Sequence, residues 1–179
     1  MTTVLLHVCC GPCSTYVVKS LQDKGLQVTA FWYNPNIHPF REHQLRLEAM
    51  QTFAQATGLP LIIAESYDML KYFQAVVGHE NKRCPDCYRL RLEKTAEVAQ
   101  ANGFEAFTTT LLISPYQKHA LLQELGEQLG KEKGVRFYYQ DFRPGFKESH
   151  RISRELSLYH QGYCGCVYSE WERYGKVKI

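Results

Sequence analysis

The chain has 179 residues, of which 45% are hydrophobic, 22% charged and 13% aromatic, and this composition is typical of one compact globular domain. It excludes intrinsic disorder, and a chain of this length buries enough surface to fold without disulfides. The formal charge of +3 permits a polyanionic partner without requiring one. The N-terminus lacks the basic flank of a signal peptide, and no apolar run approaches the ~18 residues of a membrane span. We therefore expect a cytoplasmic protein with no membrane partner.

The first part of the chain alternates predicted strands and helices. The apolar run 3–8 predicts a buried strand, and the segment 12–25 has apolar residues at helical spacing between a proline and a glycine. A β-branched and aromatic strand over 27–33 follows. Apolar residues among charges predict an amphipathic helix over about 39–57, and 59–64 is the third predicted strand.

The alternation continues through the second part of the chain. A shorter helix is expected over about 67–77, and leucine and alanine at helical spacing predict a helix over 92–102. The fourth strand is predicted at 106–111. A leucine-rich helix over 121–129 then leads to a fifth strand at 135–139.

Strands and helices that alternate five times predict an α/β fold with a parallel Rossmann-like sheet and helices on both faces. The last forty residues are expected to form a helical C-terminal segment. We find no linker, repeat or low-complexity tract, so residues 1–179 are expected to form a single metal-binding domain. In such folds the ligand site lies at the carboxyl ends of the strands.

Cysteine usage is the main chemical signal. The chain has seven cysteines, an odd number that cannot pair completely, and a reducing cytoplasm keeps thiols free. They fall into three groups: Cys9, Cys10 and Cys13; Cys84 and Cys87; Cys164 and Cys166. Tight groups separated by long stretches predict one site gathered from three loops.

Several kinds of thiol site fit such a pattern. The spacing from Cys10 to Cys13 is the CxxC form of thioredoxins, but no tryptophan precedes it, and four other cysteines would then have no role. Structural zinc could take four thiolates from the second and third groups. An iron–sulfur cluster also takes four, which leaves three cysteines over. That surplus suggests a second centre.

The ligands of the two centres are expected to divide between the groups. Adjacent residues of an extended chain point to opposite sides, so Cys9 and Cys10 are expected to face different centres. Cys13 lies one helical turn further on, within reach of Cys10. Asp141 follows the fifth predicted strand at the same edge of the sheet, and we expect it to ligate the second metal, with a turn cap as the alternative role.

Six motifs in order resemble those of the epoxyqueuosine reductase QueH family. They are His7-Val8-Cys9-Cys10-Gly11-Pro12-Cys13, Tyr33-Asn34-Pro35-Asn36-Ile37-His38, Arg83-Cys84-Pro85-Asp86-Cys87-Tyr88-Arg89-Leu90-Arg91-Leu92, Thr108-Thr109-Thr110-Leu111-Leu112-Ile113-Ser114-Pro115-Tyr116, Tyr139-Gln140-Asp141-Phe142-Arg143 and Gly162-Tyr163-Cys164-Gly165-Cys166. The resemblance spans almost the whole chain.

The resemblance implies the last step of queuosine synthesis, in which the epoxide of epoxyqueuosine at the tRNA wobble position is reduced. It also implies a fold similar to the nucleotide α-hydrolase group, whose PP-loop ATPases bind phosphate after the first strand. The corresponding loop here, Cys9 to Ser14, lacks the SGGxDS pattern, so nucleotide binding is not expected. The reduction needs two electrons, whereas an iron–sulfur cluster passes one at a time, and a second centre would fill that gap. With the resemblance we therefore expect a [4Fe–4S] cluster and an additional iron.

The candidate site residues fall into metal ligands and catalytic residues. The expected cluster ligands come from Cys9, Cys10, Cys84, Cys87, Cys164 and Cys166, and the full set of metal ligands adds Cys13 and Asp141. Asp141, Tyr116 and His38 are the candidate catalytic residues, the last two as proton donors.

Basic and aromatic residues near the cysteine motifs are candidates for binding tRNA. These are Tyr33, Arg83, Arg89, Arg143 and Arg151, which would stack on a base or meet phosphates. An electron donor such as a ferredoxin or flavodoxin is the other expected partner. The rival interpretation is an iron–sulfur electron-transfer module or a zinc-binding module without tRNA activity.

Overall fold

The computed structural model describes residues 1–179 and has one parallel sheet at its centre. The strands are β1 (Thr3–His7), β2 (Gln27–Trp32), β3 (Leu61–Ile63), β4 (Ala106–Thr109) and β5 (Arg136–Phe137). Their order in the sheet is β3-β2-β1-β4-β5, and every neighbouring pair is parallel. β1 is therefore the central strand, and its Val4, Leu5 and Leu6 are fully buried.

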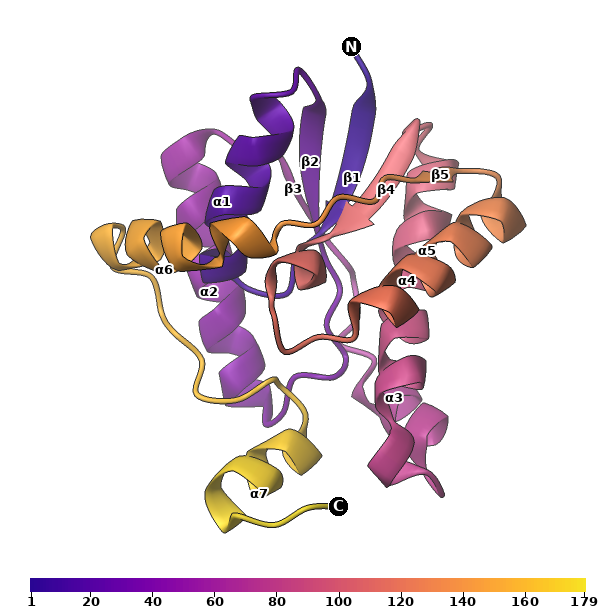
Figure 1. The fold of residues 1–179 in the computed structure, drawn as a ribbon, viewed down its shortest axis with the longest axis vertical. Coiled ribbons are helices and arrows are strands. Elements are labelled where there is room, and N and C mark those ends of the chain that lie inside the picture. The colour runs from indigo at the N-terminus through magenta and orange to yellow at the C-terminus, as the bar shows by residue number, and fades with distance from the viewer.

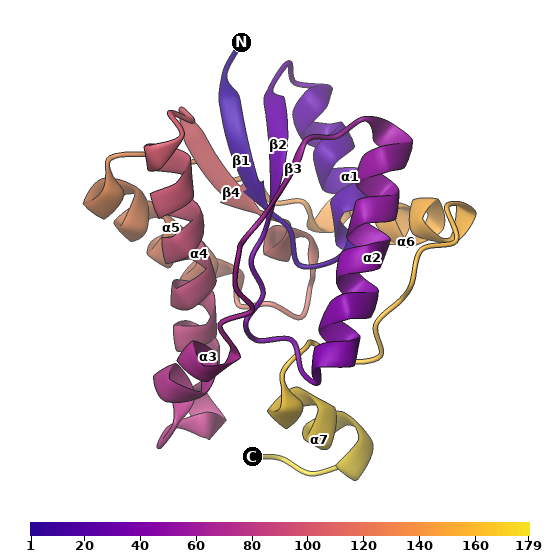
Figure 2. The same cartoon turned by 180° about the vertical axis from the view of Figure 1, so that it is seen from behind.

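Helices cover both faces of the sheet (Figures 1 and 2). Helices α1, α2 and α6 lie on one side, and α4 and α5 on the other, while α3 and α7 lie beyond the carboxyl ends of the strands. Their bounds are α1 (Gly11–Gln22), α2 (Phe40–Thr57), α3 (Met69–Val76), α4 (Cys84–Ala101), α5 (His119–Lys133), α6 (Phe146–Glu155) and α7 (Val167–Gly175). Three short 3-10 helices, at Glu80–Lys82, Thr110–Ile113 and Arg143–Gly145, complete the chain.

The carboxyl ends of the three central strands are tied together by a buried histidine. His7, the last residue of β1, is opposite Phe31 of β2 and Thr109 of β4. Its Nδ1 lies 2.9 Å from Thr109 Oγ1, and its Nε2 lies 3.1 Å from the carbonyl oxygen of Tyr33. Burial lowers the pKa of His7 to about 4, so the ring is neutral and bridges the strand ends without adding charge.

The expected fold class is confirmed: one α/β domain with a parallel Rossmann-like sheet. Several elements differ from expectation in extent, among them β3, which spans Leu61–Ile63 rather than 59–64, and α5, which spans His119–Lys133 rather than 121–129. β4 ends at Thr109 and continues as a 3-10 helix, β5 has only two residues, and α4 begins at Cys84 rather than near Leu92. The C-terminal segment is helical in α6 and α7, with a connecting loop, 156–166, that holds the third cysteine group. No helix combines the length and the apolar character needed to cross a membrane.

Candidate metal centre and active site

The first cysteine group converges on one point. The sulfur atoms of Cys9, Cys10 and Cys13 all lie within 4.8 Å of one another. Cys9 directly follows Val8 at the end of β1, and Cys10 is the N-cap of α1, where its sulfur accepts the backbone N–H of Cys13 at 3.4 Å. These positions give the trio the spacing that a shared metal ion or cluster edge requires.

The expectation that Cys9 and Cys10 point to opposite sides is wrong for this structure, because their sulfur atoms are 3.9 Å apart. Alternation holds only for a strand that continues, and here the chain leaves β1 and turns into α1 between the two residues. Gly11 permits the first turn of α1 to lie close to α2, because a Cβ there would lie 3.0 Å from the backbone oxygen of Ala49 in α2. The capping geometry therefore brings both sulfur atoms to one side.

The three thiols of the first group differ in pKa. Hydrogen bonds from Cys10 and Cys13, with a further one from Thr110, hold the pKa of Cys9 well below its usual value. The same contacts, together with burial, raise the pKa of Cys13 well above the ordinary thiol value. Thr110 Oγ1 lies 3.3 Å from Cys9 Sγ as the donor. Cys9 is thus the first of the trio to become a thiolate, the form that binds metal.

The second group lies in the first turn of α4, where Cys84 is the first helical residue and Pro85 the second. Burial raises the pKa of Cys87 to about 12; Arg91 opposes this effect, and Cys164, Cys166 and Cys84 add to it. Cys87 packs against the small buried cluster that contains Cys166, so the second and third groups lie close together. Arg91 Nη2 donates to Cys87 Sγ at 3.2 Å.

The third group lies on the loop that enters α7. Cys166 is the N-cap of α7, and its sulfur accepts the N–H of Ser169 at 3.3 Å. Burial acts to raise the pKa of Cys166, but the hydrogen bonds from Ser169 outweigh it, and the pKa is lowered. The side-chain amide of Gln117 points to the neighbouring Cys164, with 3.6 Å between Nε2 and Sγ.

All three groups thus lie at helix N-termini, those of α1, α4 and α7. The N-terminus of a helix carries a partial positive charge and unpaired N–H groups, so it stabilises thiolates. Three such ends favour an anionic metal–sulfur centre. The donor set therefore fits an iron–sulfur cluster or another thiophilic metal, since soft thiolates select these metals.

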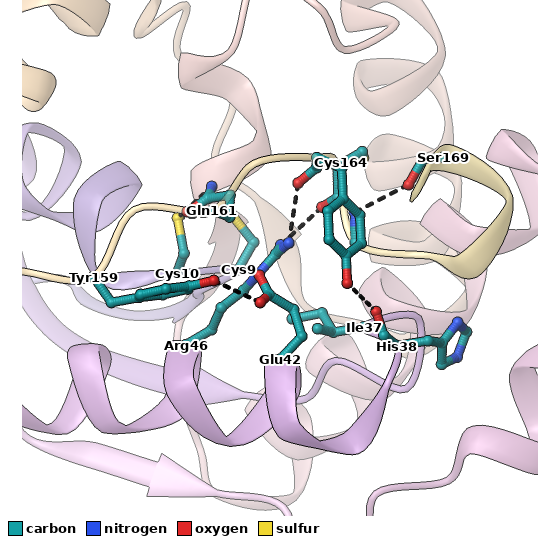
Figure 3. A network of polar contacts seen from close by, with 12 residues as sticks. Cys9, Cys10, Ile37, His38, Glu42, Arg46, Tyr159, Gln161, Cys164 and Ser169 are labelled. Carbon is teal, nitrogen blue, oxygen red and sulfur yellow. Dashed lines mark hydrogen bonds and ion pairs between the residues drawn. The ribbon is translucent and has the colours of Figure 1, made fainter. Parts of the chain in front are cut away.

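A buried ion pair from α2 holds the loop of the third group in place (Figure 3). Arg46 donates to the carbonyl oxygens of Cys164 at 2.8 Å and Tyr163 at 3.0 Å, while its Nε pairs with Glu42 at 2.7 Å. The other oxygen of Glu42 accepts the hydroxyl of Tyr159 at 2.7 Å. The loop is thereby fastened at both ends to the same two side chains.

A second contact joins this loop to the first group. Gln161 Nε2 donates to Cys10 Sγ at 3.2 Å, and Figure 3 shows Gln161 beside Cys9 and Cys10. Residues 151 positions apart in the sequence meet in this contact. The loop 156–166 therefore reaches from the trio at β1 to the group at α4.

A cavity of about 750 Å³ opens onto these thiols. Cys9, Cys13 and Cys164 line it, so two of the three groups are accessible from it. Its wall also contains a series of aromatic rings in contact: Tyr116 and Phe146 with centroids 6.2 Å apart, Phe146 and His150 at 4.6 Å, and His150 and His160 at 5.6 Å. A flat ring that entered this cavity would find apolar and aromatic surface next to sulfur.

The candidate catalytic residues lie in different environments. Tyr116 lines the cavity and is 85% exposed, so its hydroxyl is free to approach a ligand. His38 is buried outside the cavity lining; its Nδ1 accepts the N–H of Val167 at 3.2 Å, and its Nε2 lies 2.9 Å from the carbonyl oxygen of Pro35. Both nitrogens of His38 are therefore occupied by the backbone.

Asp141 is exposed and lies outside the cavity lining, in a turn before α6. Its carboxylate accepts the backbone N–H of Arg143 at 3.0 Å and the guanidinium of the same residue at 2.9 and 2.7 Å. These hydrogen bonds lower the pKa of Asp141 to about 2. The structure gives Asp141 a turn-capping contact, and its role as a metal ligand stays a prediction.

Comparison with known proteins identifies the family. The family model described as epoxyqueuosine reductase QueH matches residues 4–172. The epoxyqueuosine reductase QueH of Dehalococcoides mccartyi is 49% identical over 97% of this chain and 95% of its own length. The chain belongs to the QueH family. The epoxyqueuosine reductase QueH of Thermotoga maritima is 37% identical, with 97% of this chain and 93% of the relative aligned.

These matches confirm the expected family and its reductase class, and they do not favour a passive carrier or zinc module. The solved structure of a "predicted subunit of tRNA methyltransferase" from Methanocaldococcus jannaschii is similar with a TM-score of 0.55. It is 14% identical and covers 87% of this chain and 75% of that one, so it supports the fold alone.

The candidate tRNA-binding residues of this QueH chain do not line the cavity. Tyr33 is buried, and its hydroxyl donates to Asp68 at 2.9 Å. Each candidate arginine faces a carboxylate: Arg83 with Glu172 at 2.5 Å, Arg89 with Glu132 at 3.9 Å, Arg143 with Asp141 at 2.7 Å, and Arg151 with Glu148 at 2.6 Å. Their role in tRNA binding stays a prediction, and the contacts show that part of their charge is neutralised within the protein.

Sequence reasoning missed two features of the site. Arg46, Glu42 and Gln161 fasten the loop 156–166, yet none belongs to a motif quoted for the family resemblance, and their partners are distant in sequence. His150 and His160 line the cavity from α6 and the loop that follows it. A histidine on an amphipathic helix gives no local sign that it faces a cavity.

Proposed function

We propose that this chain reduces the epoxide of epoxyqueuosine, at the wobble position of a tRNA anticodon, to the cyclopentene of queuosine. We propose further that its thiols hold a [4Fe–4S] cluster with an additional iron beside it. One observation carries the proposal: three cysteine groups lie at three helix N-termini, and cysteines of the first and third groups line a single cavity, within a chain of the QueH family.

The balance of the reaction explains why a redox centre is needed. Both bonds of the epoxide oxygen to carbon break, a carbon–carbon double bond forms, and the oxygen leaves as water with two protons and two electrons. The bound iron–sulfur centre would supply the electrons, which an external donor such as a ferredoxin or flavodoxin would replace. Thiolates and helix N-termini are the contribution of the chain to holding that centre.

The cavity wall is suited to a base that has left the anticodon stack. A modified wobble base has to unstack before its epoxide can reach a buried centre, and proteins hold unstacked bases against aromatic rings. The rings of Tyr116, Phe146, His150 and His160 provide such a wall beside Cys13. The exposed hydroxyl of Tyr116 is the predicted proton donor that this arrangement supports best.

The remaining parts of the proposal follow from this substrate. The anticodon would approach the face that carries the cavity, near the exposed ends of α6 and α7. We place the reaction in the cytoplasm, where tRNA is modified. Residues 1–179 would act as one catalytic domain.

The deciding experiment is the anaerobic purification of the full chain, followed by iron and sulfide analysis, Mössbauer spectroscopy and turnover on tRNA that contains epoxyqueuosine. We expect more iron than sulfide, because a four-iron cluster uses only four of the seven thiols. Iron equal to sulfide would contradict the additional iron. Zinc in place of iron, or no turnover with a loaded cluster, would contradict the reductase assignment.

A variant of Asp141 tests the division of ligands. Asp141→Ala should spare the cluster colour but lose the isolated iron signal and the activity, if this carboxylate holds the second metal. Arg143→Gln is the matched control, because it removes the present partner of the carboxylate and leaves the carboxylate itself. Full activity of Asp141→Ala, or loss of its cluster, would overturn this division.

A further inference from the structure

Arg91 is a buried arginine without a carboxylate partner. Three arginines are buried, and two of them, Arg46 and Arg83, pair with Glu42 at 2.7 Å and Glu172 at 2.5 Å. Arg91 is only 2% exposed, yet no carboxylate lies within ion-pairing distance of it. Burying an isolated cation is costly, because its hydration is lost and nothing replaces it. Another kind of group has to supply the counter-charge.

Arg91 contacts a thiol directly, and its Cζ lies 5.8 Å from the centroid of the neutral Tyr88 ring, which supplies no counter-charge. Arg91 lies one helical turn after Cys87, to whose sulfur its Nη2 donates at 3.2 Å and to whose carbonyl oxygen its Nε donates at 3.1 Å. It also lines the cavity together with Cys9 and Cys164. These three cysteines come from three different groups.

We propose that Arg91 is the counter-cation of an anionic metal–thiolate centre and sets the reduction potential of that centre. This inference rests on the proposed metal site. With neutral thiols the guanidinium would be an uncompensated buried charge, whereas metal-bound thiolates from all three groups supply the negative charge that its position requires. Reduction adds one more negative charge, so a fixed cation at this distance stabilises the reduced state and raises the potential.

Arg91 acts on the centre through a ligand and not on the substrate, since its guanidinium contacts the sulfur of Cys87. Its hydrogen bonds to the sulfur and carbonyl oxygen of Cys87 also orient that ligand. Lysine would keep the charge but lose the two-pronged contact. Methionine would keep an unbranched apolar chain and lose the charge.

The test compares midpoint potentials on anaerobically prepared full chain, by redox titration followed with EPR. Arg91→Met should shift the midpoint to more negative potential, and Arg91→Lys should lie closer to wild type. Arg89→Met is the matched control: it removes a charge from the same helix, at a half-exposed position that faces Glu132 at 3.9 Å, and its midpoint should equal that of wild type. An Arg91→Met protein with full iron content and an unchanged midpoint overturns the proposal.

Two further outcomes are decisive. If Arg91→Met fails to retain iron, the iron content of Arg91→Lys tests the role of the charge. Full iron content in Arg91→Lys supports that role, and loss of iron from Arg91→Lys overturns it. If the wild-type protein holds no iron–sulfur cluster, the cofactor assignment is wrong. The affinity of the metal-free thiols for Co²⁺ then tests the role of Arg91 independently of that assignment. Binding about 10- to 100-fold weaker in Arg91→Met is then expected, and equal affinity contradicts the role of Arg91.

Discussion

Arg46 shows how one buried side chain determines the shape of the loop 156–166. Replacing it with methionine would leave Glu42 buried with only the Tyr159 hydroxyl, and would free the carbonyl oxygens of Tyr163 and Cys164. Removing one partner of a buried ion pair costs about 3–5 kcal/mol. We expect Arg46→Met to lower the free energy of urea unfolding by about that amount, and to lower the iron content because Cys164 loses its position.

The control for this prediction lies on the same helix. Arg41 is exposed in the first turn of α2, so Arg41→Met removes an equal charge without a buried partner. Equal stability of Arg46→Met and Arg41→Met would show that the loop holds its position without the ion pair.

His43 makes stability depend on pH. Burial, with the charges of Arg46 and His38, lowers its pKa to about 4, and its Nε2 accepts the indole N–H of Trp32 at 3.1 Å. Because an unfolded histidine has a pKa near 6.5, the unfolded chain binds more protons than the folded chain between about pH 6.5 and pH 4. The stability that the neutral ring supplies is therefore present above pH 6.5 and is lost as the pH falls towards 4.

We expect His43 to contribute a loss of up to about 3 kcal/mol in urea unfolding across this range, and His7, whose pKa is also lowered to about 4, to titrate over the same range. His43→Gln, whose side chain still offers an acceptor to Trp32, should remove the His43 share of the slope and leave the His7 share. The half-exposed His79 serves as the control position, and His79→Gln should keep the wild-type slope. A slope that persists unchanged in His43→Gln would assign the titration to other groups.

At the scale of elements, the packing of α5 on β5 determines how the substitution of a glycine in α5 changes the stability of the protein. Gly126 lies inside α5, where alanine would normally gain about 1 kcal/mol in helix propensity. A Cβ at this position would, however, lie 2.5 Å from Cδ1 of Phe137, whose ring packs on Phe107 with centroids 5.1 Å apart. Overpacking of this kind costs about 1–3 kcal/mol, so the clash outweighs the propensity.

Gly126→Ala should therefore lower the unfolding free energy by about 1–2 kcal/mol, measured by urea denaturation. Glu124→Ala, at an exposed position of the same helix, provides the comparison without a clash. Adding Phe137→Leu should recover part of the loss. A stabilised Gly126→Ala protein would mean that β5 moves to make room.

Local patterns in the sequence were sufficient to predict the elements that position the site, and insufficient for its contacts. The apolar run before Cys9 and the Pro12–Gly25 segment predicted β1 and α1, because periodicity and capping are local properties. The start of α4 at Cys84 was missed, since a cysteine pair around Pro85 resembles a loop as much as a first helical turn. The contact from Gln161 to Cys10 joins residues 151 positions apart, and no local pattern encodes it.

For the whole molecule, the distribution of paired and unpaired charge predicts how tRNA binds. Arg151 lies between Glu148 and Glu155, whereas Arg173 lines the cavity without a carboxylate partner. Each neutralised phosphate contributes about 0.7–0.9 to the slope of log affinity against log salt. Arg173→Glu should flatten this slope by about that value and weaken binding, with a smaller effect from Arg151→Glu.

Filter binding of tRNA across a salt series provides the measurement, and iron content should stay constant in both variants. Equal effects of the two reversals would place the tRNA across both α6 and α7. If neither variant changes the slope, the anticodon approaches from another face of the protein.

The order in which the three thiol groups are synthesised has a consequence for assembly. Cys9, Cys10 and Cys13 are made first and lie within 4.8 Å of one another, whereas Cys164 and Cys166 are made more than a hundred residues later. A stalled or truncated chain would therefore display this thiol trio with neither Gln161 nor the α7 helix to cover it. Only a chain that extends through Cys166 presents all three thiol groups.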